Sequence, residues 1–220
     1  MYMATAGREV DPGCMVSAPY IVVAGNIAAG KTTLVRWLAD ELGVPRFEER
    51  PALNPFFDRF YADPPRWAFD SQMWFLNDSL HRHHAIARGG AGGVEDRCAH
   101  EVMEVFSRQL HDDGALERDE LARIAARYRR GCRRLVPPDA VVLLDAPPDT
   151  LARRILVRGR EAEVAGVGRA YLKRLRRRYD ALFQGWSASP LIRVDTSRVD
   201  LRVRSGRSWL LGELRETLSA

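Results

Sequence analysis

One glycine-rich loop limits the folds open to this chain more than any other stretch. It reads Gly-Asn-Ile-Ala-Ala-Gly-Lys-Thr over residues 25–32, after an apolar run at residues 20–24 and before a helical pattern at residues 32–42. Strand, loop and helix in this order are the context that a G-x-x-x-x-G-K-[ST] sequence requires. The glycines let the backbone curl so that several N–H groups point at phosphate oxygens, and the helix N-terminus favours the same anion. The sequence therefore predicts a P-loop that binds nucleotide phosphates.

The residues of this loop have distinct predicted parts. We expect Lys31 to reach the β- and γ-phosphates, and the Thr32 hydroxyl to hold Mg²⁺. A glycine-rich turn with an ordinary surface lysine is the alternative, and the flanking strand and helix disfavour it. The predicted nucleotide-binding residues are Gly25, Asn26, Ile27, Ala28, Ala29, Gly30, Lys31, Thr32 and Thr33.

Apolar segments alternate with helical segments along the rest of the chain. Strands are predicted at residues 20–24, 44–49, 94–97, 140–145 and 191–195. Helices are predicted at residues 32–42, 54–61, 66–80, 100–109, 117–134, 149–158, 171–183 and 209–218, whereas residues 159–163 leave the helical pattern. This alternation favours a parallel sheet with right-handed crossovers. We predict an α/β fold with a five-stranded parallel sheet flanked by helices and the third strand at its centre.

The length and composition of the chain are typical of a soluble globular protein. At 220 residues it suits one domain, which we expect over residues 19–220 after a disordered tail at residues 1–18. Hydrophobic residues make up 46% and charged residues 29%, a balance found in soluble globular proteins. No apolar run approaches the roughly 20 residues that span a bilayer, and no secretion signal opens the chain. We predict a cytoplasmic protein with no membrane partner.

The cysteines and histidines do not form a metal-binding pattern. The three cysteines are far apart and lack C-x-x-C spacing, which excludes a predicted disulfide framework or zinc site. His81 and His84 share a helix face, but no carboxylate or cysteine lies at a suitable spacing. A surface helix is therefore the favoured interpretation of His81, His83 and His84.

The net charge of +5 raises the question of a nucleic-acid partner. Many of the positive residues are arginines within residues 153–178. Arginine forks recognise phosphate oxygens in pairs, so the phosphates of a small molecule explain the charge as well as a polynucleotide does. We consider a nucleic-acid partner unlikely from this pattern.

The combined motifs resemble the deoxynucleoside kinase family, whose members phosphorylate the 5′-hydroxyl of deoxynucleosides. The resemblance covers residues 20–195, and the branch of the family that it resembles most is that of the bacterial deoxyadenosine kinases. It implies a P-loop kinase fold with an arginine-bearing lid at about residues 157–168, ATP as phosphate donor, Mg²⁺ and a homodimer. The motifs that carry it, in order, are residues 25–32, Glu49 with Asn54-Pro55, residues 60–72, Asp96-Arg97 and residues 154–163.

The resemblance also implies the catalytic roles. Glu49 resembles the general base that takes the proton from the 5′-hydroxyl, whereas a solvated strand end is favoured for Glu48. Arg97 would hold that carboxylate, and Asp96 would act through Mg²⁺ or its water shell. The resemblance further implies lid arginines that neutralise the transferring phosphoryl group; solvated arginines are the alternative. These are Arg154, Arg158 and Arg160.

Substrate recognition follows the same resemblance. Tyr61 and Glu163 resemble the pair that binds the sugar 3′-hydroxyl, and Gln72 resembles the residue that pairs with the base edge. Phe106 would stack on the base, although Phe106 and Tyr61 could instead be plain core residues.

Several positions depart from the family pattern. Ser79 and Val102 stand where purine- and cytosine-preferring members carry an arginine and an aspartate. Without that charge pair the pocket cannot select a base by its exocyclic amino group. The expectation of a deoxyadenosine preference is therefore weaker, and thymidine or a broad range of bases is plausible. Cys98 replaces a serine or threonine, and Arg50 replaces a proline beside the expected base.

Two other functions are compatible with the same residues. One is another small P-loop kinase that acts on a nucleoside monophosphate or a secondary-metabolite nucleoside; it needs an anion site, for which Arg50, Arg66 and Arg129 are candidates by charge alone. The other is a nucleotide- or nucleic-acid-binding module without turnover, suggested by the basic helix at residues 117–134.

Overall fold

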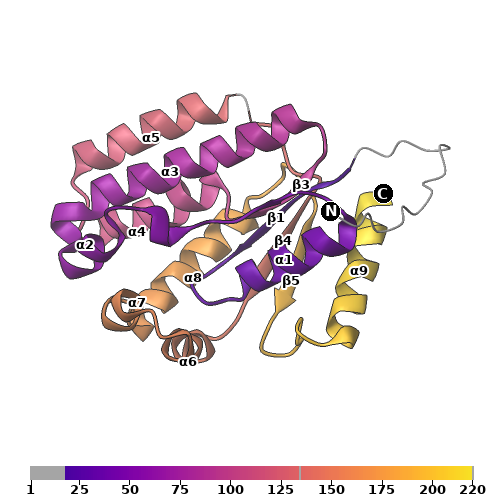
Figure 1. Ribbon diagram of the computed structural model, residues 1–220. Coiled ribbons are helices and arrows are strands. Elements are labelled where there is room, and N and C mark those ends of the chain that lie inside the picture. Colours follow the sequence, from indigo (N-terminus) through magenta and orange to yellow (C-terminus); the bar gives the residue numbers. More distant parts are fainter. Residues whose placement is uncertain (1–17, 134, 220) are drawn as a thin grey trace, which may run out of the picture.

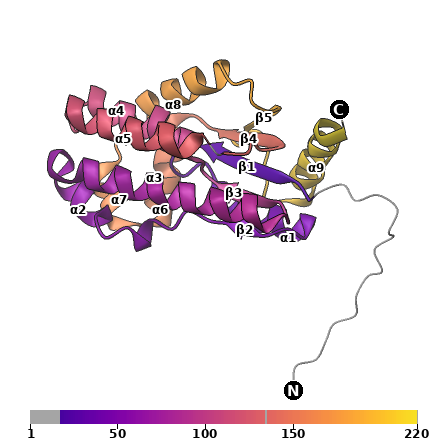
Figure 2. The same cartoon turned by 90° about the horizontal axis from the view of Figure 1, so that it is seen from above.

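The computed structural model describes residues 18–133 and 135–219. The predicted tail therefore lies outside the described residues, except for Ala18, and so does Arg134 of the predicted basic helix. Five parallel strands form one sheet in the order β2-β3-β1-β4-β5, with helices on both of its faces (Figure 1). Figure 2 shows α1 on one side of this sheet and α8 on the other. The predicted α/β fold with a five-stranded parallel sheet is confirmed.

The strands end close to their predicted positions because each is bounded by polar or turn-forming residues. They are β1 (Tyr20–Gly25), β2 (Arg46–Phe47), β3 (Gly93–Asp96), β4 (Ala140–Asp145) and β5 (Leu191–Asp195). The prediction that the third strand is central is wrong, since β3 lies between β2 and β1. The physical reason is that β1 is a longer strand without charged residues, which suits a strand covered on both faces, whereas β3 has four residues and ends in two carboxylates.

The helices follow the predicted pattern with three differences. They are α1 (Lys31–Leu42), α2 (Phe57–Ala62), α3 (Pro64–Gly89), α4 (Arg108–Asp112), α5 (Arg118–Cys132), α6 (Pro148–Arg158), α7 (Glu161–Gly166), α8 (Arg169–Gln184) and α9 (Arg204–Ser219), with a 3₁₀ turn η1 (Pro51–Leu53) and a π-helical turn η2 (Glu101–Ser107). Helix α3 continues nine residues past the predicted end, and α9 starts five residues early. The prediction that residues 159–163 are not helical is confirmed for Gly159 and Arg160, where Gly159 ends α6 in a left-handed conformation, and is wrong for residues 161–163, because a new helix starts at Glu161.

A buried polar chain joins α3 to the sheet. The Tyr20 hydroxyl donates to Glu95 Oε2 over 2.5 Å and lies 3.2 Å from His83 Nδ1. His83 Nε2 accepts the Val136 N–H over 2.9 Å, so a neutral ring carries its proton on Nδ1 and donates it to Tyr20. His83 is thus a buried hydrogen-bonding residue, and the prediction that it lies on a solvated surface is wrong. No cluster of histidine, cysteine and carboxylate side chains that could hold a metal ion occurs among the described residues.

Acid is expected to destabilise this protein partly through His83. Burial, with His84 and His100 nearby, lowers the pKa of His83 to about 4, so between pH 6.5 and pH 4 the unfolded chain binds a proton that the folded chain does not. Stability therefore falls as the pH drops through this range. Between pH 7 and pH 5 the free energy of unfolding should fall by about 2 kcal/mol more in wild type than in His83→Gln.

Urea denaturation of both proteins at pH 7, 6 and 5 measures this difference. Burial also raises the pKa of Glu95 to about 7, which gives the opposite slope, but Glu95 is present in both proteins. Parallel pH curves for the two proteins would show that His83 is protonated in the folded state.

Candidate active site

The P-loop connects β1 to α1 in a conformation that only glycine allows at its first position. Gly25 has φ +142°, and a Cβ atom there would lie 2.4 Å from the Leu144 carbonyl oxygen of β4. Gly30, just before α1, has φ +106°. These angles are open to glycine and strained for other residues. The loop therefore wraps closely over the end of the sheet and leaves its amides at the N-terminus of α1.

Lys31 and Thr32 point from the start of α1 toward the end of β3. The Lys31 ammonium is buried and donates to the Asn26 carbonyl over 3.0 Å. Burial and the Arg97 charge lower the pKa of Lys31 to about 8. The charges of Asp96, Glu101 and Glu49 oppose this shift only in part, which is the state expected of a group that binds an anionic ligand.

Asp96, the last residue of β3, faces Thr32. The Thr32 hydroxyl donates to Asp96 Oδ2 over 2.6 Å, and the second oxygen, Oδ1, is buried without a hydrogen-bond partner among the residues that the structure describes. Burial raises the pKa of Asp96 above its ordinary value. A hydroxyl and an unsatisfied carboxylate oxygen are hard ligands of the kind that Mg²⁺ prefers, so these two side chains fit a cation that is also bound by phosphates.

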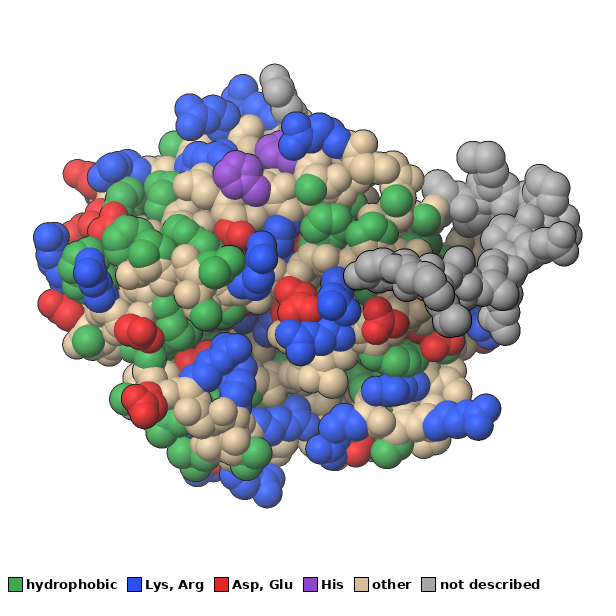
Figure 3. Space-filling view, viewed as in Figure 1, with side chains coloured by type: hydrophobic (Ala, Val, Ile, Leu, Met, Phe, Trp, Pro, Cys, Tyr) green, Lys and Arg blue, Asp and Glu red, His purple; other side chains and the backbone are tan. Residues whose placement is uncertain are grey.

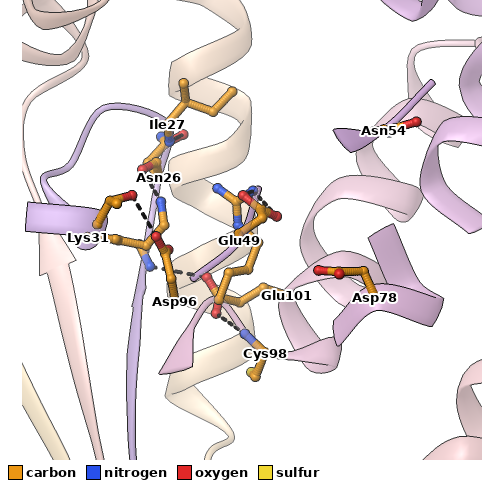
Figure 4. A network of polar contacts seen from close by, with 12 residues as sticks. Asn26, Ile27, Lys31, Glu49, Asn54, Asp78, Asp96, Cys98 and Glu101 are labelled. Atoms are coloured by element: carbon orange, nitrogen blue, oxygen red, sulfur yellow. Dashed lines mark hydrogen bonds and ion pairs between the residues drawn. The ribbon is translucent and has the colours of Figure 1, made fainter. Parts of the chain in front are cut away.

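A charged pair lies at the ends of β2 and β3. Arg97 Nη1 donates to both oxygens of Glu49, over 2.9 and 2.7 Å, and both side chains are about nine-tenths buried. The Arg97 guanidinium also lies 4.4 Å from the ring centroid of Phe106. Figure 4 shows Glu49, Asp96 and Lys31 converging from three separate elements.

The neighbouring carboxylate, Glu48, lies outside this group. It pairs with Arg36 of α1 over 2.7 Å and with Arg46 over 3.4 Å at the surface. Because side chains alternate at the end of a strand, Glu48 and Glu49 point in different directions. Of the two, Glu49 lines a cavity beside the P-loop, called the inner cavity below, and Glu48 does not.

This inner cavity, of about 80 Å³, lies beside the P-loop and is enclosed by α2, α3 and the α6–α7 corner. Tyr61, Gln72 and Phe106 line it, together with Glu49. The Gln72 side chain is 5% exposed and has no hydrogen-bond partner among the described residues. A buried amide is costly unless it is paired, so this one is available to a polar ligand.

The predicted lid arginines divide between two places. Arg158 and Arg160 line the inner cavity. Both form ion pairs with Glu163, and the Arg160 pair has an N–O distance of 3.2 Å. Arg154 instead donates to the carbonyl and the hydroxyl of Thr196, both over 2.9 Å. Arg154 and Arg158 are four positions apart on α6, but Thr196 binds the first side chain and Glu163 binds the second, so the predicted trio does not lie in one cavity.

Arg154 belongs to a second, larger cavity of about 560 Å³ on the other side of the P-loop. Gly30 and Thr33 line it, together with the loop at residues 196–202. The sequence analysis did not identify this loop. Its position directly after β5, at the carboxyl edge of the sheet where α/β proteins bind ligands, is the signal that could have found it.

Glu101 is a second residue that the sequence analysis missed. It is fully buried in η2, where its carboxylate accepts the N–H of Gly25 over 3.1 Å, that of Cys98 over 3.0 Å and the Tyr179 hydroxyl over 2.9 Å. It therefore ties the P-loop to the turn that follows β3. No local signal distinguished it, because Glu104 lies in the same turn and the partners of Glu101 are distant in sequence.

Ser79 and Val102, the positions that depart from the family pattern, line neither cavity. Val102 packs in the apolar cluster between α3 and α5. The Ser79 hydroxyl is buried without a partner. Neither side chain presents a charge to the site.

Comparison with known proteins agrees with this geometry. The sequence profile of the deoxynucleoside kinases matches residues 21–210. The chain belongs to the deoxynucleoside kinase family. Its curated relatives are kinases, that is, transferases, and include a deoxyadenosine/deoxycytidine kinase of Bacillus subtilis, 29% identical over 82% of this chain and 84% of the relative. A deoxyadenosine kinase of Dictyostelium discoideum is 31% identical over 81% of this chain and 72% of the relative.

A solved structure shares the fold of this deoxynucleoside kinase. Deoxyadenosine kinase from M. mycoides with bound dCTP has a TM-score of 0.77 and 22% identity, covering 90% of this chain and 99% of the other. Within residues 18–133 and 135–219, no helix is long and apolar enough to cross a bilayer.

Proposed function

We propose that this protein transfers the γ-phosphoryl group of ATP to the 5′-hydroxyl of a deoxynucleoside. The observation that carries the proposal is the Glu49–Arg97 pair, which lies in one cavity with Lys31 of the P-loop. A carboxylate fixed beside a buried phosphate-binding lysine can serve as a base for a hydroxyl nucleophile. The nucleoside would occupy the inner cavity, and the donor base would occupy the larger cavity beside Arg154.

The chemistry follows from the positions of these groups. The 5′-hydroxyl oxygen attacks the γ-phosphorus and its proton passes to Glu49, while the bond from the γ-phosphorus to the bridging oxygen of ADP breaks. Arg97 holds the Glu49 carboxylate in place through its two short contacts. Lys31, Arg158 and Arg160 would neutralise the charge on the transferring group and so lower the barrier.

The sugar and base would be recognised by the remaining cavity residues. Glu163 now pairs with two arginines, and exchange of one of these contacts for the sugar 3′-hydroxyl would free a guanidinium for the phosphates. Tyr61 lies against the same corner, since a Cβ on Gly166 of α7 would be 2.3 Å from its ring. Gln72 would pair with the base edge, and Phe106 would support the base face. Because no charged pair reads an exocyclic amino group, we expect acceptance of several bases, thymine included.

We also propose that Thr32 and Asp96 hold Mg²⁺. When bound, the ion would neutralise charge on the donor phosphates. The support is the unsatisfied Asp96 Oδ1 beside the Thr32 hydroxyl.

Asp96→Asn is expected to raise the Mg²⁺ concentration for half-maximal activity about 10–100-fold, because an amide oxygen binds a hard cation more weakly than a carboxylate. The asparagine oxygen can still accept the Thr32 hydroxyl, which keeps the local fold. Titration of Mg²⁺ at fixed ATP measures the effect. Asp40→Asn, at a surface carboxylate on the same helix as Thr32, is the control and should leave the titration unchanged. An unaltered titration in Asp96→Asn would remove Asp96 from the metal site.

The two other functions have less support. Arg50, Arg66 and Arg129 do not line the inner cavity, so no acceptor-phosphate site for a nucleoside monophosphate follows from them. Part of the arginine-rich stretch at residues 153–178 is neutralised, because four arginines of α8 pair with aspartates: Arg169, Arg174, Arg176 and Arg178. Figure 3 shows positive and negative side chains interspersed over one face rather than a continuous basic stripe. A homodimer, as the family resemblance implies, and the cytoplasmic location predicted from the sequence complete the proposal.

A coupled ADP-release assay with four deoxynucleosides, their ribose counterparts and their 5′-monophosphates tests the function. We expect ADP release with at least two deoxynucleosides and Mg²⁺, and little with monophosphates. Release with the monophosphates alone would support the other kinase, and no release with any acceptor would refute turnover.

A further inference from the structure

Besides Arg97, another buried guanidinium, that of Arg82 on α3, lies where β2 and β3 end. Its Nη1 donates to the carbonyl oxygens of Phe47, over 3.2 Å, and Asp96, over 2.7 Å. Its Nη2 donates to the carbonyl oxygen of Arg97 over 3.2 Å. One planar group therefore joins the last residue of β2 to the turn that follows β3.

The charge of this guanidinium is compensated inside the protein. Arg82 Nε donates to Asp78 Oδ2 over 3.0 Å, and Nη1 lies 3.4 Å from Glu95 Oε1. Arg82 is 8% exposed and lines neither the inner cavity nor the larger one. It therefore has no direct access to a bound substrate, and any effect on the reaction passes through the backbone it holds.

The carbonyls that Arg82 binds belong to the backbone that carries the charged pair. Phe47 lies two residues before Glu49, and Asp96 and Arg97 are themselves site residues. Arg97 has φ +63°, a left-handed conformation that is uncommon for a residue with a side chain and persists only when its surroundings enforce it. Arg82 holds this turn by donating to the carbonyl oxygens of Asp96 and Arg97. Glu101 holds it by accepting the N–H of Cys98.

We propose that Arg82 is a positioning residue for phosphoryl transfer: it fixes the relative places of the β2 and β3 ends and thereby the contact between Glu49 and Arg97. This inference rests on the function proposed above. A lysine cannot replace the fork, because one ammonium has no planar set of donors to reach two strand ends at once.

The first test compares Arg82→Met and Arg82→Lys with Leu80→Ala. Leu80 is a fully buried residue of the same helix that packs in the cluster between α3 and α5, so its truncation lowers the melting temperature without touching the strand ends. We expect kcat to fall about 10–100-fold in Arg82→Met, with the KM for ATP within about threefold, since a small misplacement of reacting groups has this effect. The kcat of Arg82→Lys should lie between those of wild type and Arg82→Met, and Leu80→Ala should keep the wild-type kcat. Equal kcat values in both Arg82 variants and wild type would overturn the proposal.

The second test asks whether Arg82 acts through Arg97. In an Arg97→Met background the further change Arg82→Met should lower kcat less than about threefold, because the group it positions is already absent. A full multiplicative loss would mean that Arg82 acts on another part of the reaction, and it would overturn the proposal.

A third readout does not depend on turnover. The Arg97 amide donates to the Val23 carbonyl over 3.1 Å and the Cys98 amide donates to Glu101, so hydrogen exchange reports the order of this turn. Both amides should exchange at least about tenfold faster in Arg82→Met or Arg82→Lys than in Leu80→Ala. Unchanged exchange overturns the inference about Arg82, whereas an inactive wild-type protein with altered exchange overturns only the proposed function.

Discussion

Glu49→Gln is expected to phosphorylate deoxynucleosides about 10²–10⁴-fold more slowly than wild type, because the 5′-hydroxyl loses its proton acceptor. The substitution is nearly isosteric, and its amide oxygen can still accept a hydrogen bond from Arg97 Nη1. ATP should therefore bind with nearly unchanged affinity, since Glu49 does not line the larger cavity. Single-turnover rates and ATP binding by calorimetry separate the two effects.

Glu48→Gln is the matched control for this prediction. Glu48 is adjacent in sequence and carries the same charge, but it pairs with Arg36 at the surface. Its removal should change kcat less than about twofold, because surface ion pairs have small effects. If Glu49→Gln kept the wild-type rate while Glu48→Gln lost it, the roles of the two carboxylates would have to be exchanged.

Lys31→Met is expected to lower kcat/KM by about 10²–10³-fold or more, because one fixed donor to the charge of the transition state is lost. Its effect on stability should have the opposite sign. The charged form of Lys31 is disfavoured in the folded protein, where burial lowers its pKa to about 8, so removing the charge at pH 7 should leave the melting temperature equal or raise it.

The pH dependence of stability checks the physical reason. Between pH 8 and pH 10.5 the unfolded chain keeps a proton on Lys31 that the folded chain has lost, so wild-type stability rises with pH relative to Lys31→Met. Lys173→Met, at the only other lysine in the sequence, is the control and should match wild type in rate. A Lys31→Met protein that is both less stable and fully active would contradict the proposed role of the P-loop.

Periodicity and turn chemistry made most of the fold predictable from sequence. The apolar runs of β1 and β4 and the glycine loop are local signals, so their positions follow from short stretches of residues. The order of strands is different, because it depends on which strand is covered on both faces. The central place of β1 follows from its pairing with β3 on one side and β4 on the other, which joins residues far apart in the sequence.

The site was predictable where a residue lies next to a recognisable motif, and it was not where the partner is distant in sequence. Glu49 could be placed by its distance from Asn54, but the contact between Arg82 and Phe47 joins residues 35 positions apart. Likewise Arg154 looks equivalent to Arg158 on a helical wheel, yet Thr196 of the β5 loop holds it in another cavity. A buried charge in a helix signals that a partner exists without identifying it.

The backbone of Gly25 lies so close to that of β4 that this position cannot be varied in attempts to change the donor preference of this enzyme. With a carbonyl of β4 only 2.4 Å from where a Cβ would lie, mutant libraries that vary this position will return misfolded clones whatever nucleotide is offered. The loop at residues 196–202 forms a wall of the larger cavity and contains exposed side chains such as Arg198 and Arg202. Substitutions at these two exposed side chains would alter the lining of the larger cavity and leave the contacts of Thr196 with β4 in place.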